Sequence, residues 1–457
     1  MMSDDLAERI AALMPRAQAD LAELVAIPSV ADPRQYPPEE CRRAAQWVAD
    51  AFTEAGLRDV HLALTPDGSH AVLGHRPAPP GAPTVLLYCH YDVQPPLDED
   101  AWTSPPFRLT ERDGRWYGRG AADCKGNIVM HLTALRALGE DLPVGVKLVA
   151  EGSEEQGTGG LEQYVPGHID ELLADALLIA DTGNAAVGVP TATTSLRGVA
   201  NLVVTVSTLR GDVHSGMFGG AAPDALAALI RILDSLRGPQ GGTVIKGLDC
   251  TGSWSGEGYD EEQFRADAGV LDGVSLIGGG TVADRLWARP AVTVLGIDCP
   301  PVVGSAAAVP ATARARVSLR VPPGTDPEAA LQALTAHLRT AAPWGARVEV
   351  ERESTGSPFS ATTSGPAYAA LDRAAREVYG KPLAYVGQGG SIPLCNVLAR
   401  TYPEAEIVLM GVEEPLCAIH APDESVDPTE IQRMAQVEAE FLRGYAEVWR
   451  SGRRGGS

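Results

Sequence analysis

The chain has 457 residues, more than one hydrophobic core usually holds, so its length predicts two domains. Hydrophobic residues make up 45% and charged residues 21%, a globular composition that excludes a disordered chain, a collagen-like repeat and a coiled-coil rod. The 37 Lys and Arg against 59 Asp and Glu give a formal net charge of −22, which argues against nucleic acid or an anionic membrane surface as partner.

The cysteines and the N-terminal residues predict a compartment. The seven cysteines form no C-x-x-C pair and are odd in number, which excludes a disulfide framework and a zinc ribbon. The first residues, MMSDDLAERIAALMP, are acidic where a signal peptide would be basic, and no stretch approaches 18 consecutive apolar residues. We therefore expect a cytoplasmic protein without a transmembrane helix.

The first third of the chain reads as an α/β pattern. Apolar residues at helical spacing predict helices over residues 4–26 and 38–55, and a third helix over 127–137. Continuous apolar runs predict strands that are buried on both faces: Thr84–Cys89, Val146–Ala150 and Ala176–Ala180. Strands that alternate with helices in this way indicate a sheet covered by helices.

The pattern changes near residue 196. Strands are expected at Gly198–Ser207, at Thr312–Val321, where apolar and polar residues alternate strictly, and at Ala346–Glu351. Helices are expected at Pro223–Leu236 and Pro327–Thr340. One polar sheet face indicates a small α+β domain, in which the glycine-rich residues 238–280 form a long loop.

After residue 356 the first pattern returns. A helix is predicted at 365–379, a glycine-rich loop at Gly387–Ser391, a strand at Glu406–Met410 and a closing helix at 428–450. The expected organisation is one α/β domain interrupted by an inserted α+β domain. The predicted boundaries are residues 1–196 for the first part of the α/β domain, 197–356 for the insertion and 357–457 for the second part.

Side chains that could carry chemistry follow the predicted strands. They are His90 with Asp92, Asp123, the pair Glu154-Glu155, Asp181 and His420. Any one of them is explained by a satisfied polar residue, a solvated turn or a helix cap. Together, at the carboxyl ends of strands where ligands of α/β sheets gather, they favour a metal site. Imidazole and carboxylate ligands suit Zn²⁺, Co²⁺ or Mn²⁺, and their number allows two ions.

Three segments resemble the metal motifs of the M20 metallopeptidase family, the carnosinase-like and aminoacylase-like dinuclear metal hydrolases. They are TVLLYCHYDVQP (Thr84–Pro95), WYGRGAADCKGN (Trp116–Asn127) and EGSEEQGTGG (Glu151–Gly160). The resemblance extends over nearly the whole chain. It implies a zinc-exopeptidase-like catalytic domain, with a mixed central sheet flanked by helices, interrupted by an α+β lid and dimerisation domain.

The resemblance also implies a role for each metal-site residue. His90 and Asp181 would hold one divalent metal, Glu155 and His420 the other, and Asp123 would bridge both. Zn²⁺ is the expected ion at both positions, with Co²⁺ or Mn²⁺ as alternatives.

The remaining roles concern the reaction. Asp92 would orient His90, and Glu154 would be the general base that takes a proton from a metal-bridging water and passes it to the leaving amine. His214, in GDVHSGMFGG, would reach the active site of the partner subunit of a homodimer and stabilise the oxyanion.

Two further positions are expected to bind the substrate's terminal carboxylate. Arg320, on the polar face of the alternating strand, matches the family's carboxylate-binding arginine, although a solvated sheet face shared with Arg314 and Arg316 would also explain it. The loop residues Gly390 and Ser391, in GQGGSIP, match the segment that approaches the same carboxylate.

The expected activity is therefore metal-dependent hydrolysis of dipeptides or small peptides with a free C-terminal carboxylate. The sequence HYDVQP and an Asp, not a Glu, at position 181 resemble the dipeptidase branch. Hydrolysis of N-acyl amino acids, as by an aminoacylase or a succinyl-diaminopimelate desuccinylase, is the alternative. A non-catalytic scaffold is disfavoured because all ligands and the base are present. No serine-hydrolase elbow and no nucleotide-binding glycine motif occurs.

Overall fold

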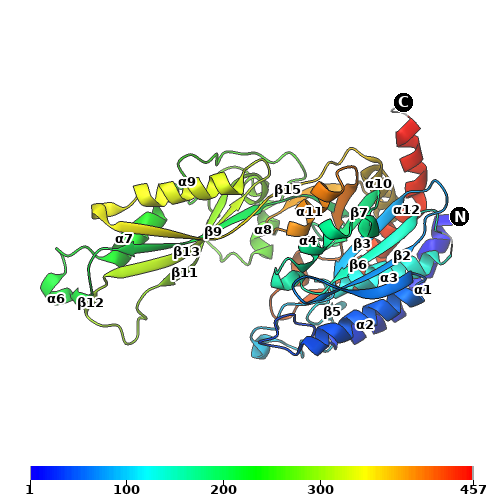
Figure 1. Cartoon of the computed structure of the whole chain (residues 1–457), viewed down its shortest axis with the longest axis horizontal. Coiled ribbons are helices and arrows are strands. Elements are labelled where there is room, and N and C mark those ends of the chain that lie inside the picture. Colours follow the sequence, from blue (N-terminus) through cyan, green and yellow to red (C-terminus); the bar gives the residue numbers. More distant parts are fainter. Residues whose placement is uncertain (1, 141, 455–457) are drawn as a thin grey trace. The chain divides into compact units, whose positions relative to one another are not determined.

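The computed structural model describes residues 2–140 and 142–454, which divide into two compact units (Figure 1). Unit 1 comprises the described residues of Met1–Thr194, Ala361–Val386 and Pro393–Ser457, and unit 2 comprises Ser195–Ser360 and Gly387–Ile392. The loop 387–392 thus groups with unit 2, whereas the predicted boundaries assign it to the second part of the α/β domain.

Unit 1 is built on a mixed sheet in the order β1-β2-β6-β3-β7-β17-β8. The four strands β6, β3, β7 and β17 run parallel to their neighbours in this group, while β1, β2 and β8 pair antiparallel. The strands are β1 (Arg58–Leu64), β2 (His70–Arg76), β3 (Thr84–His90), β6 (Gly145–Glu151), β7 (Ala176–Ala180), β8 (Thr191–Leu196) and β17 (Glu406–Met410). The predicted α/β fold with a mixed central sheet is confirmed.

Helices flank this sheet because its strands are apolar on both faces. Val85 and Leu87 of β3 join the core formed with the long helices, and Leu86 and Tyr88 on the opposite face are equally buried. The helices are α1 (Met2–Val25), α2 (Pro38–Glu54), α3 (Lys125–Leu138), α4 (Gly160–Tyr164), α5 (Ile169–Leu172), α10 (Pro366–Tyr379), α11 (Pro393–Thr401) and α12 (Pro428–Arg454). A small sheet, β18-β5-β4, is formed by β4 (Thr110–Arg112), β5 (Arg115–Tyr117) and β18 (Ser425–Val426).

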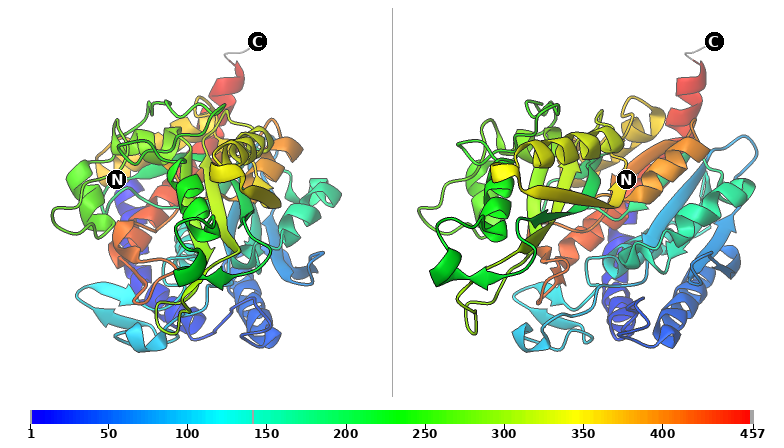
Figure 2. Two further views of the ribbon diagram at one scale, coloured as in Figure 1. Left: turned by 90° about the vertical axis from the view of Figure 1, so that its left-hand side faces the viewer. Right: turned by 60° about the vertical axis from the view of Figure 1, so that its left-hand side comes forward.

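Unit 2 is an antiparallel sheet in the order β11-β13-β9-β14, with α7 (Ala225–Asp234) and α9 (Pro327–Thr340) on one face (Figures 1 and 2). The alternation seen in the sequence sets this arrangement: Val317, Leu319 and Val321 face the helices, while Ser318 and Arg320 between them face away. The strands are β9 (Gly198–Ser207), β11 (Ala291–Asp298), β13 (Thr312–Val321) and β14 (Arg347–Gly356).

Shorter elements complete unit 2. They are β10 (Val213–His214), α6 (Ser215–Phe218), α8 (Glu261–Asp267), β12 (Ala308–Val309) and β15 (Phe359–Ser360). The expected loop 238–280 therefore contains a helix, α8. It forms because Asp260 caps it, accepting hydrogen bonds from the main-chain N–H groups of Glu262 and Gln263. Strand β16 (Ala384–Gln388) includes the first two residues of the expected glycine-rich loop.

None of the helices in the described part of the chain is both long and apolar enough to cross a membrane.

A buried polar pair joins two helices of unit 1 to the sheet. The His131 imidazole of α3 lies 2.7 Å from a carboxylate oxygen of Glu438 on α12 and 3.2 Å from the carbonyl oxygen of Tyr88 on β3. Both side chains of the pair are fully buried. This histidine, which matches no motif in the sequence, is therefore a structural residue.

We predict that Glu438→Ala destabilises unit 1, because it leaves the buried imidazole without its carboxylate partner. The expected loss of unfolding free energy is about 3 kcal/mol, obtained from the shift of the urea unfolding midpoint and the m value. Glu447→Ala is the matched control on the same helix, since that carboxylate is exposed and lies 3.5 Å from Arg373. Its loss should stay below about 1 kcal/mol. Equal losses in the two variants would show that the buried pair adds nothing.

Candidate metal centre

The parallel strands of unit 1 bring the predicted ligands to one edge of the sheet. His90 is the last residue of β3, and Glu154 and Glu155 follow β6 in a short helical turn. Asp181 follows β7 directly. Because the carboxyl ends of parallel strands lie at the same edge, chain segments far apart in sequence meet there.

Asp123 lies at the centre of this cluster, between two imidazoles. One of its carboxylate oxygens, Oδ1, lies 3.0 Å from Nε2 of His90, and the other, Oδ2, lies 3.0 Å from Nε2 of His420. A second carboxylate faces each imidazole: Asp181 at 3.1 Å from His90, and Glu155 at 3.3 Å from His420. The five residues thus form two half-sites that share Asp123.

Burial disfavours negative charge on the three carboxylates of Asp181, Glu154 and Glu155. Burial raises the pKa of Asp181 to about 6. Burial also raises the pKa of Glu154, and the negative charge of Asp181 adds to this effect. The pKa of Glu155 is raised in the same way, by burial and by the negative charge of Asp123. Hydrogen bonds to Asp123 and Glu155 raise the pKa of His420 to about 10. The two imidazoles alone therefore do not offset the charge of the crowded acids.

The cluster fits divalent cations. Oxygen Oε1 of Glu155 is buried and has no hydrogen-bond partner, so its free lone pairs are available to an ion. Ligand atoms of His90, Asp123 and Glu155 lie within 4.8 Å of one another. Imidazole nitrogens combined with carboxylate oxygens are the donors that Zn²⁺, Co²⁺ and Mn²⁺ bind in proteins.

Two further residues lie beside these ligands, Glu413 and Cys124, and sequence reasoning did not single out Glu413. Glu413 follows β17, is buried, and has a carboxylate oxygen within 4.8 Å of ligand atoms of Asp123 and Asp181. Its position after a buried strand, the same signal that marked Asp181, could have identified it. The Cys124 thiol lies in a similar group with His90 and Asp181, and the Asp123–Cys124 peptide bond is cis.

A buried glutamate, Glu424, holds the loop that carries Asp123. Its carboxylate accepts hydrogen bonds from the main-chain N–H groups of Gly120, Ala122 and Asp123 at 2.9–3.1 Å. It also forms an ion pair of 2.7 Å with Arg119, and both side chains are almost fully buried. Nothing in the local sequence distinguishes Glu424 from the other acids near His420, because its partners lie about 300 residues away in the chain.

Asp92 connects the first ligand to the loop of the expected general base. Its carboxylate accepts hydrogen bonds from the main-chain N–H groups of Glu154 at 3.2 Å and Glu155 at 3.0 Å. Its main-chain carbonyl lies 3.0 Å from Nδ1 of His90, and its carboxylate 3.4 Å from the same nitrogen. One residue therefore positions both an imidazole and the turn of the glutamate pair.

The other predicted residues belong to unit 2. His214 ends β10, is exposed, and accepts a hydrogen bond at Nδ1 from the N–H group of Gly216. Arg320 lies on β13, where partial burial lowers the pKa of its guanidinium. Gly390 and Ser391 lie in the loop Gly387–Ile392. The cluster around Asp123 thus contains none of these four residues.

Comparison with known proteins assigns the class. Residues 86–444 match the model of peptidase family M20/M25/M40. The chain is 46% identical over 445 residues to a cysteinylglycine-S-conjugate dipeptidase of Corynebacterium striatum. This match covers 95% of this chain and 97% of that relative. It is 29% identical over 391 residues to a β-Ala-His dipeptidase of Rattus norvegicus, covering 79% of this chain and 78% of the relative.

A solved structure agrees with these matches. Human carnosine dipeptidase 1 superimposes with a TM-score of 0.82 at 25% identity, over 98% of this chain and 99% of that one. The chain therefore belongs to peptidase family M20/M25/M40, and the predicted membership of the M20 metallopeptidases is confirmed. Within that family, the matches support the predicted dipeptidase branch.

We predict that Asp92→Asn weakens metal binding by about 10- to 100-fold, because the neutral amide no longer supports the imidazole of His90 or accepts both N–H groups. Competition with a chromogenic chelator measures the affinity. Asp98→Asn is the control, since Asp98 is exposed and caps only a short helical turn. An unchanged affinity in the Asp92 variant would remove this residue from the support of the site.

Proposed function

We propose that the protein is a metal-dependent dipeptidase that hydrolyses the amide bond of dipeptides or small peptides with a free C-terminal carboxylate. The observation that carries this proposal is the shared carboxylate of Asp123, with a different imidazole 3.0 Å from each oxygen. The dipeptidase names of the relatives support it. The name of the Corynebacterium relative makes S-substituted Cys-Gly the first substrate to test.

His90 and Asp181 would hold one ion, Glu155 and His420 the other, and Asp123 both. Zn²⁺ is the proposed ion. Two such cations, when bound, acidify water and polarise the scissile carbonyl.

Glu154 is the proposed general base. It belongs to the same short helical turn as Glu155, and the Asp92 carboxylate accepts hydrogen bonds from the main-chain N–H groups of both residues. Glu154 would accept the proton of the attacking water and deliver it to the leaving amine. Burial and the charge of Asp181 raise its pKa, which suits a carboxylate that must accept a proton and later release it.

A homodimer is proposed, in which unit 1 is the catalytic domain and unit 2 the lid and dimerisation domain. Strand β11 supports this proposal, because it forms one edge of its sheet and exposes the apolar side chains of Val294, Leu295 and Ile297. An exposed apolar edge is suited to pairing with a second copy of the chain. His214 would then stabilise the oxyanion in the partner's active site.

A cytoplasmic location is proposed from the cysteines. All seven are free, and Cys89, Cys124, Cys395 and Cys417 are buried. Unpaired thiols are the usual state in a reducing compartment.

Hydrolysis of S-benzyl-Cys-Gly, Cys-Gly and β-Ala-His by the Zn²⁺-, Co²⁺- or Mn²⁺-loaded protein is the test of the proposed function. We expect turnover of at least one of these dipeptides and none of N-acetyl or N-succinyl amino acids. Activity on the acyl amino acids alone would establish the deacylase alternative instead.

Glu154→Ala should lower kcat by orders of magnitude while both metal ions remain bound, because Glu154 is a proton carrier and not a ligand. Metal content and kcat are measured on the same preparation. Glu162→Ala is the control, since this nearby glutamate on α4 lies outside the cluster. Unchanged turnover in the Glu154 variant would remove it from the mechanism.

Mixing two inactive variants tests whether His214 acts across the interface. Glu154→Ala and His214→Ala subunits, unfolded and refolded together, should regain about a quarter of wild-type activity, because random pairing makes half the dimers mixed and each mixed dimer has one intact site. Each variant refolded alone is the control. A mixture as inactive as the controls would show that His214 acts within its own subunit, and an active His214→Ala control would remove His214 from the mechanism.

A further inference from the structure

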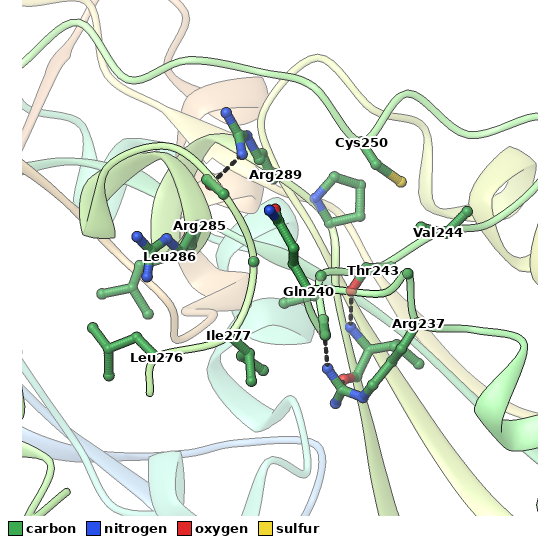
Figure 3. Close-up of a pocket in the computed structure, with 18 of the residues that line it drawn as sticks. Arg237, Gln240, Thr243, Val244, Cys250, Leu276, Ile277, Arg285, Leu286 and Arg289 are labelled. Atoms are coloured by element: carbon green, nitrogen blue, oxygen red, sulfur yellow. Dashed lines mark hydrogen bonds between the residues drawn. The ribbon is translucent and has the colours of Figure 1, made fainter. Parts of the chain in front are cut away.

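A cavity of about 730 Å³ in unit 2 is lined by four arginines, of which Arg237, Arg285 and Arg289 are labelled in Figure 3. Three of them donate hydrogen bonds to main-chain carbonyls of the surrounding loops. Arg237 contacts the carbonyls of Gly241 and Val292, Arg285 that of Gly280, and Arg289 those of Gly252 and Gly279. These three guanidinium groups therefore hold the glycine-rich loops in place.

The fourth arginine, Arg197, has no such partners. It is 8% exposed, and its Nε and Nη1 groups have no hydrogen-bond acceptor. Among the described residues, no carboxylate forms an ion pair with it, and the charge that most affects it is the positive charge of Arg320. Burial, with that charge adding to it, lowers the pKa of Arg197 to about 10. An uncompensated buried cation is costly and favours an anion beside it.

The register of the sheet relates Arg197 to Arg320. Arg320 of β13 pairs with Val199 of β9, which pairs on its other side with Gly356 of β14. Side chains of paired residues lie on the same face of a sheet, and Arg197 lies just before β9, two residues ahead of Val199. Arg320 thus lies on the face opposite to the helices of unit 2, and its positive charge acts on the nearby guanidinium of Arg197.

The glycine-rich loop reaches the same face. A Cβ atom on Gly356 would lie 3.9 Å from the hydroxyl oxygen of Ser391. A Cβ atom on Gly389 would lie 2.6 Å from Nη2 of Arg197, so this guanidinium lies directly against the loop. The main-chain N–H of Arg197 also donates to the carbonyl of Gln388. Arg197 therefore lies against the loop whose hydroxyl is expected at the carboxylate.

We propose that Arg197 is a second specificity-determining arginine, which binds the terminal carboxylate of the substrate together with Arg320 and Ser391. This inference rests on the proposed function, because it assigns the recognition of the carboxylate that a dipeptide presents. The bound anion offsets the charge of two adjacent guanidinium groups that otherwise repel each other. A substrate whose terminus is a neutral amide leaves that repulsion in place.

Binding of a non-hydrolysable inhibitor to the metal-loaded protein tests the proposal. The probes are a phosphinate analogue of a dipeptide with a C-terminal carboxylate and the same phosphinate with a C-terminal carboxamide, and calorimetry gives both Kd values. Arg197→Gln should weaken binding of the acid by about 10- to 100-fold and that of the amide by less than about 3-fold. Arg197→Lys, which keeps the positive charge, should lose less affinity for the acid than Arg197→Gln does.

Arg314→Gln is the matched control. Arg314 lies on the same face of β13 but is exposed and paired with Asp298, so this variant should bind both probes like the wild type. Melting temperatures report folding, and Arg197→Lys remains informative if Arg197→Gln does not fold. Equal weakening of acid and amide in both Arg197 variants, or no weakening in either, would overturn the proposal.

Turnover by the wild type distinguishes a failure of the proposed function from a failure of the role proposed for Arg197. If the wild type hydrolyses dipeptides while the Arg197 variants bind the acid as tightly as it does, only the role of Arg197 is wrong. If the wild type neither hydrolyses dipeptides nor prefers the acid over the amide, the proposed function and the role of Arg197 are both wrong.

Discussion

The structure of the candidate site depends on one carboxylate that two imidazoles share. Each oxygen of Asp123 lies 3.0 Å from a different histidine, so neither half-site is complete without it. The position of Asp123 is set by Glu424, whose carboxylate accepts three main-chain N–H groups of the loop and pairs with Arg119. A buried carboxylate that accepts several main-chain hydrogen bonds and also pairs with a buried guanidinium is held in one position, and it restrains the loop that carries the shared ligand.

The same cluster shows why charge position matters more than charge number. The protein carries 59 acidic residues, and only a small group of them is buried at the edge of the sheet. Burial there raises the pKa of Asp181, Glu154 and Glu155. Their ionisation is therefore opposed unless nearby cations compensate the negative charge. The remaining acids contribute to the charge of −22 without taking part in this balance.

Much of the fold and of the metal cluster could be predicted from the sequence, because the signals were local. The apolar runs of β3, β6 and β7 and the alternation of β13 each lie within about ten residues. The helix α8 was missed because one capping aspartate, Asp260, starts it inside a glycine-rich segment. Glu424 and Arg197 were missed for another reason: their importance depends on partners brought together by the sheet registers and loops, which no local pattern encodes.

The order of the strands has a consequence for biosynthesis. β17 inserts between β7 and β8, although it lies more than 200 residues after β8 in the chain. His90, Asp123 and Asp181 are all synthesised early, but His420 leaves the ribosome only after the whole of unit 2. The second half-site therefore stays open until the chain has been made beyond unit 2 as far as His420. If the proposed function is correct, the nascent chain carries no complete hydrolytic centre while its own unfolded segments are still exposed.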